Sequence, residues 1–220
     1  MNDFLLFIKL LLQNYSLLRI FQIIEINKLN LVGRTIEFGA SRENSKNFSY
    51  YIKEKKLLNF SNIFTDKNSN IFYADLTKKL KISSNKYQNI LIFNVLEHLQ
   101  SHIITFSELR RILKKNGLMI GSTPFLYQVH GAPNDYFRFT RDYFDNIFKK
   151  GNFKKIQIVS LGCGPFVASY SLLQSYLKYL PILNQLIFFI CYLFDSFIQL
   201  FVKTKLKEIY PIGYFFKIQK

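Results

Sequence analysis

The sequence predicts an α/β fold: a mostly parallel sheet with helices on both faces, and a hydrophobic helical insertion before the last strand. Three observations support this prediction. Short apolar runs alternate with helical segments along most of the chain, a pattern typical of parallel sheets. The length of 220 residues fits one domain with room for an insertion. Hydrophobic residues make up 49% of the chain, which is enough for a full core.

The strands are expected at the apolar runs, several of which end at a glycine, an acid or a proline. In chain order the predicted strands are 34–38, 62–65, 71–74, 90–93, 118–122, 154–159 and 213–218. Because helical segments separate most of them, neighbouring strands are expected to run parallel.

The helices are expected at the N-terminus and between the strands. Residues 1–30 predict one amphipathic helix, since polar side chains recur every three or four positions from Lys9 to Gln22. Its wide apolar face would cover the sheet or lie on a bilayer. Further helices are expected over 44–57, over 102–114 with Ser101 as the cap, and from a cap at Thr140 to Gly151.

The chain carries a formal net charge of +16, which in general indicates nucleic acid or an anionic membrane surface as a partner. Lysine far exceeds arginine and tryptophan is absent, a bias typical of a genome poor in G and C. No basic run is interleaved with stacking aromatic residues, so no nucleic-acid partner is predicted. An anionic membrane surface is therefore the expected charged partner.

Cysteine and histidine usage predicts no metal site. Cys163 and Cys191 have no metal-ligand spacing and no disulfide-rich context, so both are interpreted as small buried hydrophobes in a reducing cytosol. Glu97 and His98 begin the turn after the fourth predicted strand. His98 is interpreted as structural, and Glu97 as part of a pocket floor.

Acidic residues follow the first three predicted strands. In sheets of this kind, ligands bind at the carboxyl ends of the strands, beside the switch in strand order. Glu37 is followed by Gly39 and Ser41, small residues that let the backbone approach a ligand. Asp66, after the second strand, is placed to accept hydrogen bonds from two ribose hydroxyls, and Asp75 can meet an adenine amino group. As an alternative, Asp66 and Asp75 are simple turn or cap residues.

Several motifs resemble a known family. TIEFGAS resembles a degenerate first motif of class I S-adenosylmethionine (AdoMet)-dependent methyltransferases. NILIFNVLEHLQ, LRRILKKNGLMIGSTPF and HGAPNDYFRFT resemble the methyltransferase type 11 family, in particular a bacterial branch with an H-x-x-P-x-D-Y-x-R-F-T pattern. The resemblance covers about residues 33–151, and its specific part is 94–140. It implies a Rossmann-like fold with a seven-stranded sheet, an antiparallel last strand and AdoMet as the cofactor.

The resemblance also implies roles for particular residues. It assigns to the cofactor Glu37, Gly39 and Ser41 beside the methionine part, Asp66 at the ribose, Asp75 near the adenine, and Asn94 at the sulfonium. The sequence departs from the family in its glycine loop, because Ser41 replaces the second glycine and Glu43 the third.

The loop after the fifth predicted strand is the expected acceptor side. Methyl transfer requires mainly that the acceptor be aligned and water excluded. His130 is the candidate base, since imidazole exchanges protons near neutral pH, and Asp135 is the second candidate. Tyr136 and Arg138 are expected to hold the substrate, with Arg138 suited to a carboxylate or phosphate. As an alternative, Arg138 pairs with Asp135 and braces the loop.

The segment 166–202 lies between the sixth and seventh predicted strands and is strongly apolar. A helix crossing a membrane here would bury Asp195 at a cost of roughly 2.5 to 3.5 kcal/mol. Because the last strand must rejoin the sheet, an interfacial or re-entrant helical segment is predicted instead. A soluble cap or dimer face is the alternative. The flanking basic residues suit anionic headgroups: Lys178, Lys203, Lys205 and Lys207.

The predicted organisation is an N-terminal helix over 1–30, a methyltransferase core over 31–164, the insertion over 165–207, and the last strand over 208–220. The expected function is methyl transfer to a hydroxyl of a membrane-proximal or glycan-related metabolite, the glycan part resting on the resemblance. The alternatives are a lipid- or quinone-type methyltransferase and a catalytically inactive binding module. The expected location is cytoplasmic and peripheral at the inner face of the cytoplasmic membrane, and the oligomeric state stays open.

Overall fold

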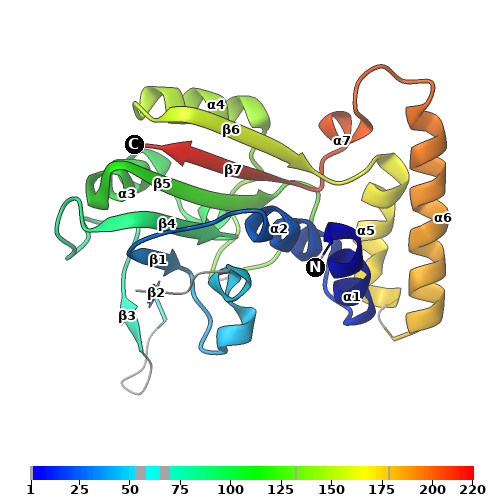
Figure 1. Ribbon diagram of the computed structural model, residues 1–220, viewed down its shortest axis with the longest axis horizontal. Helices are drawn as coiled ribbons and strands as arrows, with labels where there is room; N and C mark the ends of the chain where they lie inside the picture. Colours follow the sequence, from blue (N-terminus) through cyan, green and yellow to red (C-terminus); the bar gives the residue numbers. More distant parts are fainter. Residues whose placement is uncertain (1, 53–57, 65–69, 132, 178) are drawn as a thin grey trace.

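The structure, a computed structural model, describes residues 2–52, 58–64, 70–131, 133–177 and 179–220. A seven-stranded sheet with the order β3-β2-β1-β4-β5-β7-β6 forms its centre (Figure 1). The strands β1 to β5 run parallel to one another, whereas β7 is antiparallel to both β5 and β6. The strands are β1 Thr35–Phe38, β2 Leu58–Asn62, β3 Ile71–Tyr73, β4 Tyr87–Phe93, β5 Leu113–Pro124, β6 Lys154–Leu161 and β7 Gly213–Gln219. The predicted fold class is therefore confirmed.

Helices cover both faces of the sheet, and each face has its own apolar core. One core lies under α3 and α4 and includes Phe106, Phe144 and Phe216. The other lies under α2 and α5 and includes Ile20 and Phe215. The helices are α1 Asp3–Leu12, α2 Leu17–Asn27, α3 His102–Ile112, α4 Arg141–Lys150, α5 Pro165–Leu177, α6 Pro181–Gln199 and α7 Leu206–Ile209; short 3-10 turns are η1 Asn44–Lys46, η2 Phe48–Tyr51 and η3 Leu96–His98.

The single N-terminal helix expected from the sequence is two helices. The chain turns at Asn14, which has a φ of 57°, a left-handed conformation that asparagine tolerates. The Ser16 hydroxyl then accepts a hydrogen bond from the backbone N–H of Arg19 and caps α2. The polar stripe of the predicted helix is therefore divided, and Gln22 is fully buried against the sheet.

The predicted helix over 44–57 is wrong for its described part, which ends at residue 52 and holds only η1 and η2. Side chains compete with the helix for backbone groups here. Asn47 pairs with both the N–H and the carbonyl of Ser41, at 2.6 and 3.0 Å, and Glu37 takes the N–H groups of Phe48 and Ser49.

Two element boundaries also differ from prediction. The second strand was expected over 62–65, but β2 ends at Asn62, where that strand should begin. The helix expected to reach residue 114 ends at Ile112, because Leu113 already pairs with Tyr87 of β4. Ser101 stands at the start of this helix without a side-chain cap, whereas Thr140 caps α4 as predicted, accepting from the N–H of Tyr143 at 3.3 Å.

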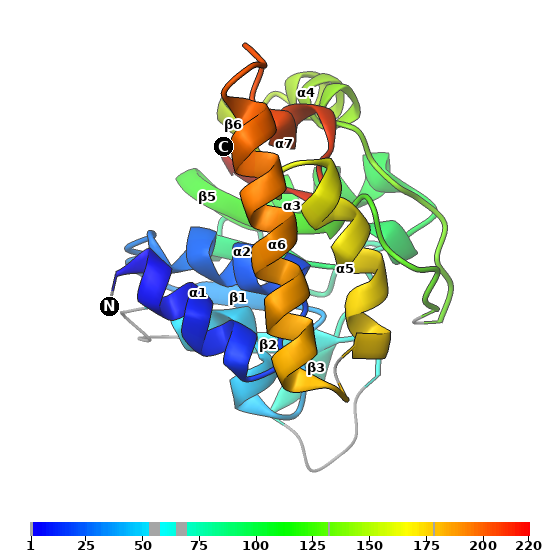
Figure 2. The same ribbon diagram turned by 90° about the vertical axis from the view of Figure 1, so that its right-hand side faces the viewer.

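Two helices of the insertion, α5 and α6, pack side by side at one end of the sheet, next to α1 (Figure 2). Two polar residues of α6, Asn184 and Asp195, point inward and are buried. Asp195 is 3% exposed and accepts hydrogen bonds from the N–H groups of Phe166 and Val167, at 3.0 and 2.9 Å, so that it caps α5. The Tyr170 hydroxyl donates to Asn184 Oδ1 at 2.6 Å. A membrane crossing would expose Asp195 to lipid. Its contacts with α5 explain why an acidic residue lies in this apolar helix.

The outward side of α6 is apolar. In length and composition α6 could cross a membrane, and 17% of its apolar window is buried within the protein. Its large exposed side chains include Ile182, Leu186, Leu193, Phe197 and, just after the helix, Leu200. The usual arrangement of a surface helix is thus reversed, with polar groups inside and apolar groups outside.

Candidate functional site

A cavity of about 160 Å³ lies at the carboxyl ends of β1 and β4, where the strand order reverses. Doubly wound sheets bind their ligands at this point. Apolar side chains, two amides and an imidazole line it, among them Phe38, Ala74, Leu76, Leu99, Asn62, Asn94 and His98. Of the predicted cofactor residues, Gly39 and Asn94 border this cavity. Gly39 has a φ of 71°, and a Cβ there would meet Val95 Cγ2 at 2.4 Å, so close packing also requires glycine.

Glu37 ends β1, but it is not among the described residues that line the cavity. Its buried carboxylate accepts hydrogen bonds from the N–H groups of Phe48 and Ser49, at 2.8 and 2.9 Å. Burial raises the pKa of Glu37, while the hydrogen bonds from Ser49 and Phe48 and the charge of Arg19 act in the opposite direction. Glu37 therefore fixes the loop that follows β1.

The other predicted cofactor residues either do not line the cavity or lie outside the described residues. The backbone N–H of Ser41 donates to Asn47, and Ser41 does not line the cavity. Asp75 accepts from the N–H and the hydroxyl of Thr77, at 3.0 and 2.6 Å, and so occupies the turn role considered as its alternative. Asp66 lies outside the described residues.

Asn94 separates the first cavity from a second, of about 170 Å³, that is bordered by α2 and the loop after β5. Its φ is 53°, which directs the chain sharply away from β4. Gln22 Nε2 donates to Asn94 Oδ1 at 2.7 Å and to Ser122 Oγ at 3.0 Å. The second cavity is lined in part by Arg19, Gln22, Asn94 and His130, and it is the candidate acceptor site.

The predicted acceptor residues form a connected group in the loop after β5. The N–H of His130 donates to Asp135 Oδ2 at 2.9 Å, and His130 Nδ1 lies 3.4 Å from the same oxygen. Arg138 pairs with both oxygens of Asp135, and its hydrogen bonds hold the pKa of that carboxyl well below its usual range. Arg138 Nη2 also donates to the carbonyl of Gln128 at 3.2 Å.

Asp135 and Arg138 therefore brace the loop and position His130. This bracing role is the alternative that the sequence left open for Arg138. Only His130 of this group lines the acceptor cavity. Tyr136 is 41% exposed, and its hydroxyl accepts a hydrogen bond from Gln100 Nε2 at 2.8 Å.

Glu97 and His98, which follow β4, lie with His130 in the wall between the two cavities. Glu97 is completely buried, and burial raises its pKa to about 8. Burial likewise lowers the pKa of His98. The rings of His98 and His130 lie edge to face with centroids 5.0 Å apart. The wall between the two cavities thus holds a carboxyl group and two imidazoles.

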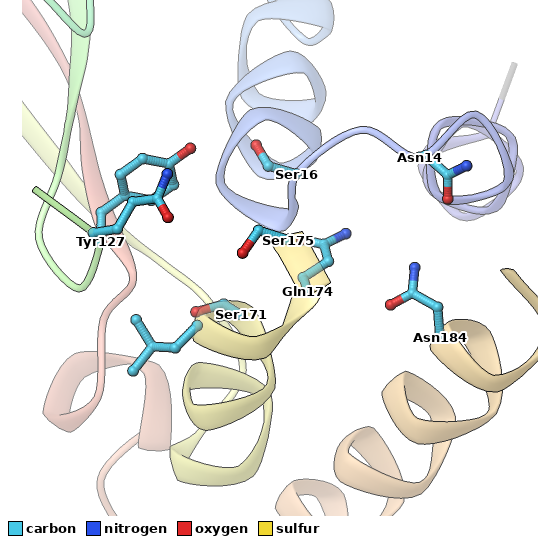
Figure 3. Close-up of a pocket in the computed structure, with 9 residues that line it drawn as sticks. Asn14, Ser16, Tyr127, Ser171, Gln174, Ser175 and Asn184 are labelled. Carbon is cyan, nitrogen blue, oxygen red and sulfur yellow. The ribbon is translucent and has the colours of Figure 1, made fainter. Parts of the chain in front are cut away.

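A third cavity, of about 190 Å³, continues from the acceptor cavity toward α5 and α6, sharing Ser16 and Tyr127 with it. Figure 3 shows hydroxyl and amide side chains around it, from the turn between α1 and α2, the loop after β5, and both helices of the insertion. Gln174 fixes this arrangement, because it accepts from the N–H of Leu17 at 2.8 Å and donates to the carbonyl of Tyr15 at 2.9 Å.

The residues of the two central cavities that sequence reasoning missed include Arg19, Gln22 and Asn62. Arg19 and Gln22 were placed on the polar stripe of a surface helix, and only the packing of α2 over the sheet reveals their position. Asn62 was placed at the start of a strand rather than at its end. A polar residue inside an otherwise apolar helix, as at Gln22, is the one signal that could have identified it.

Solved structures of class I AdoMet-dependent methyltransferases share this fold. A methyltransferase of Thermotoga maritima, described as a possible histamine N-methyltransferase, has 12% identity and a TM-score of 0.59, covering 96% of this chain and 92% of its own. One from Archaeoglobus fulgidus has 13% identity and a TM-score of 0.57, covering 92% and 91%.

Phosphoethanolamine N-methyltransferase 2 of Haemonchus contortus, in complex with phosphomonomethylethanolamine and S-adenosylhomocysteine, has 14% identity and a TM-score of 0.52. The alignment covers 90% of this chain but 52% of the nematode protein, so this chain spans about half its length. No family model and no curated protein sequence matches the chain. At these identities the comparisons establish the fold.

Proposed function

We propose that this protein transfers a methyl group from AdoMet to an oxygen acceptor presented at a membrane surface. The observation that carries the proposal is the position of Asn94, which borders both the cavity at the switch point of the sheet and the acceptor cavity beside it. A reaction between two bound molecules needs two adjoining sites, and this arrangement supplies them.

The residues of the first cavity suit AdoMet. Ala74, Leu76 and Leu99 provide apolar walls for an adenine ring, and the amides of Asn62 and Asn94 can meet hydroxyl and amino-acid groups. The volume of about 160 Å³ is below the roughly 300 Å³ of small-molecule sites, so binding requires the cavity to widen. The exposed side chains of Ile63 and Phe64, at its rim, can move to allow this.

AdoMet supplies a methyl group activated by a sulfonium, and the chain has to align the acceptor. His130, positioned by Asp135, can accept the acceptor's hydroxyl proton. The acceptor oxygen then forms the bond to the methyl carbon while the bond from that carbon to sulfur breaks. Gln22, which is fully buried, donates to Asn94 Oδ1 and so holds the Asn94 amide at this point.

The acceptor side favours a polar molecule held near a bilayer. Hydroxyl and amide side chains line the third cavity, and such groups suit a sugar or a polar headgroup better than the apolar chain of a quinone. The apolar outer side of α6, with Lys203, Lys205 and Lys207 beyond its end, suits the surface of an anionic membrane. We propose a peripheral location at the cytoplasmic face of a membrane, and these two features support contact with an anionic membrane surface.

Calorimetric titration with AdoMet tests the proposed function. In Asn94→Gly the amide is removed but the positive φ is tolerated, and Asn116→Gly is a matched control because Asn116 is exposed with a φ of 62°. We expect micromolar binding by the unaltered protein, at least a tenfold loss in Asn94→Gly, and no change in the control. A folded protein that does not bind AdoMet would refute the proposal and favour an inactive binding module.

A further inference from the structure

Three side chains that can bind metal converge on the wall between the two central cavities. They are Glu97 and His98 of η3 and His130 of the loop after β5. One ligand atom from each lies within 4.8 Å of the other two, and His98 Nε2 is 3.9 Å from Glu97 Oε1. Small adjustments of the side chains would bring such a set around one ion.

The carboxyl group of Glu97 is the second observation. Its side chain is 0% exposed, and neither of its oxygens has a hydrogen-bond partner in the described structure. A buried carboxyl group is normally hydrogen-bonded, paired with a cation or bound to a metal, because leaving its oxygens without any partner is costly whether the group is charged or neutral. The charged neighbours Asp135 and Arg138 already neutralise each other through their salt bridge. Glu97 therefore has no cation of its own within the described chain.

The imidazoles are oriented as metal ligands commonly are. His98 Nδ1 lies 2.6 Å from the carbonyl of Asn134, and since a carbonyl only accepts, this nitrogen carries the proton. The lone pair of the neutral ring is then on Nε2, on the side of Glu97. His130 Nδ1 lies near the carbonyl of Gln128 and near Asp135, at 3.3 and 3.4 Å. Outer-shell acceptors of this kind fix the tautomer of metal-binding histidines.

We propose that Glu97, His98 and His130 form a binding site for a divalent metal ion. Two imidazoles and one carboxylate suit ions such as Zn²⁺, Mn²⁺, Fe²⁺ and Co²⁺ rather than Ca²⁺ or Mg²⁺. Three protein ligands leave coordination positions open for a further molecule.

The location indicates what the ion would do, an assignment that rests on the proposed methyl transfer. His98 lines the cavity at the switch point and His130 lines the acceptor cavity, so the ion would lie where an acceptor oxygen meets the methyl group. The ion would lower the pKa of a hydroxyl bound to it, so that the hydroxyl gives its proton to solvent more readily. The oxygen would then bond to the methyl carbon while the bond from that carbon to the sulfonium sulfur breaks. His130 would then be a ligand, and the bound ion would replace its role as proton acceptor.

Cobalt titration of the metal-free full chain tests the site, because Co²⁺ bound to nitrogen and oxygen ligands gives visible absorption bands. The variants are Glu97→Gln and His130→Ala; the controls are Glu43→Gln at an exposed carboxylate and His102→Gln at a histidine outside the cluster. Melting curves without metal establish that each variant is folded. We expect the unaltered protein to bind one equivalent of Co²⁺ with micromolar affinity and to melt at a higher temperature when Zn²⁺ is added. Co²⁺ affinity should fall at least tenfold in Glu97→Gln and in His130→Ala and should not change in the two controls.

AdoMet titration of the same samples separates the two proposals. AdoMet binding without cobalt binding, in a folded unaltered protein, would overturn the metal site and leave the methyltransferase proposal standing. Cobalt binding that survives in both variants would also overturn the site. Cobalt binding lost in the variants, without AdoMet binding by any sample, would support the metal site and refute its assigned role in methyl transfer.

Discussion

Gln22 Nε2 donates a hydrogen bond to Asn94 Oδ1 at 2.7 Å, which joins an N-terminal helix to the end of the central strand β4. The same amide nitrogen reaches Ser122 Oγ at 3.0 Å, and Gln22 is fully buried. Through this contact, α2 acts as one wall of the site as well as a cover for the sheet.

Substitution of Gln22 by alanine is expected to weaken both stability and the site. The half-buried Asn94 and the fully buried Ser122 each lose a hydrogen-bond partner, at a cost of about 1–3 kcal/mol, and AdoMet affinity falls because the amide of Asn94 is no longer fixed. Urea unfolding and calorimetry measure the two effects. Gln13→Ala, at an exposed position before α2, should change neither. Unaltered AdoMet affinity in a folded Gln22→Ala would contradict the positioning role.

Glu37→Gln is expected to destabilise the protein by about 1–3 kcal/mol, because an amide cannot accept on both sides from the N–H groups of Phe48 and Ser49. Urea unfolding measures the change. The control Glu43→Gln, at an exposed ion pair with Lys46, should cost under about 1 kcal/mol. Equal stabilities of the two variants would show that Glu37 does not hold the loop.

Asp195→Ala tests the cap that α6 provides for α5. The part-buried N–H of Phe166 and the buried N–H of Val167 lose their acceptor, so a loss of about 2 kcal/mol is expected in chemical unfolding. Asp142→Ala, in the exposed first turn of α4, should cost less than about 1 kcal/mol. A small effect at Asp195 would favour an α6 that separates readily from α5.

The apolar outer side of α6 is expected to bind vesicles that contain anionic lipid. A double variant, Leu193→Ser with Phe197→Ser, should lower flotation with such vesicles severalfold without lowering stability, since these side chains are 65% and 60% exposed. Ile103→Ser, at an exposed residue of α3, is the matched control. Should the double variant instead dissociate a dimer in sedimentation, this face would be a contact between copies of the chain.

Cys163 is expected to be unreactive in the native protein. Burial, with the nearby charge of Asp195, raises its pKa to about 12, so at pH 8 only about one thiol in 10⁴ is ionised. In Cys191→Ser, the remaining thiol should react with a disulfide reagent only after denaturant is added. Rapid reaction without denaturant would show that α6 does not cover this residue.

Much of the fold could be predicted because it depends on local patterns. The apolar runs at 34–38 and 90–93 placed β1 and β4 closely, and the cap at Thr140 placed α4. The second strand was predicted too late in the chain, over 62–65, because the run from residue 57 to 64 mixes polar and apolar residues without a clear period. The helix over 44–57 failed because the distant Glu37 takes the N–H groups of Phe48 and Ser49, while the Asn47 side chain is bonded to the backbone of Ser41, before the predicted helix.

The candidate site could be predicted only in part, because motifs mark residues along the chain without showing which side chains reach a cavity. Gly39, Asn94 and His130 were found because motifs mark them, and all three border a cavity. Tyr136 and Arg138 belong to the same motif, yet Arg138 braces the loop and Tyr136 is bonded to Gln100. A motif indicates that residues act together, but it does not distinguish the side chain at the site from those that hold it.

The sequence by itself determined most of the strand pattern and the apolar character of the segment before β7, because these depend on periodicity and composition along the chain. Only the tertiary structure decided which side of α6 faces outward, that Gln22 reaches Asn94, and that Glu97, His98 and His130 meet at one wall. The physical reason is that these contacts join segments far apart in the chain, and their geometry is set by how helices and loops pack on the sheet.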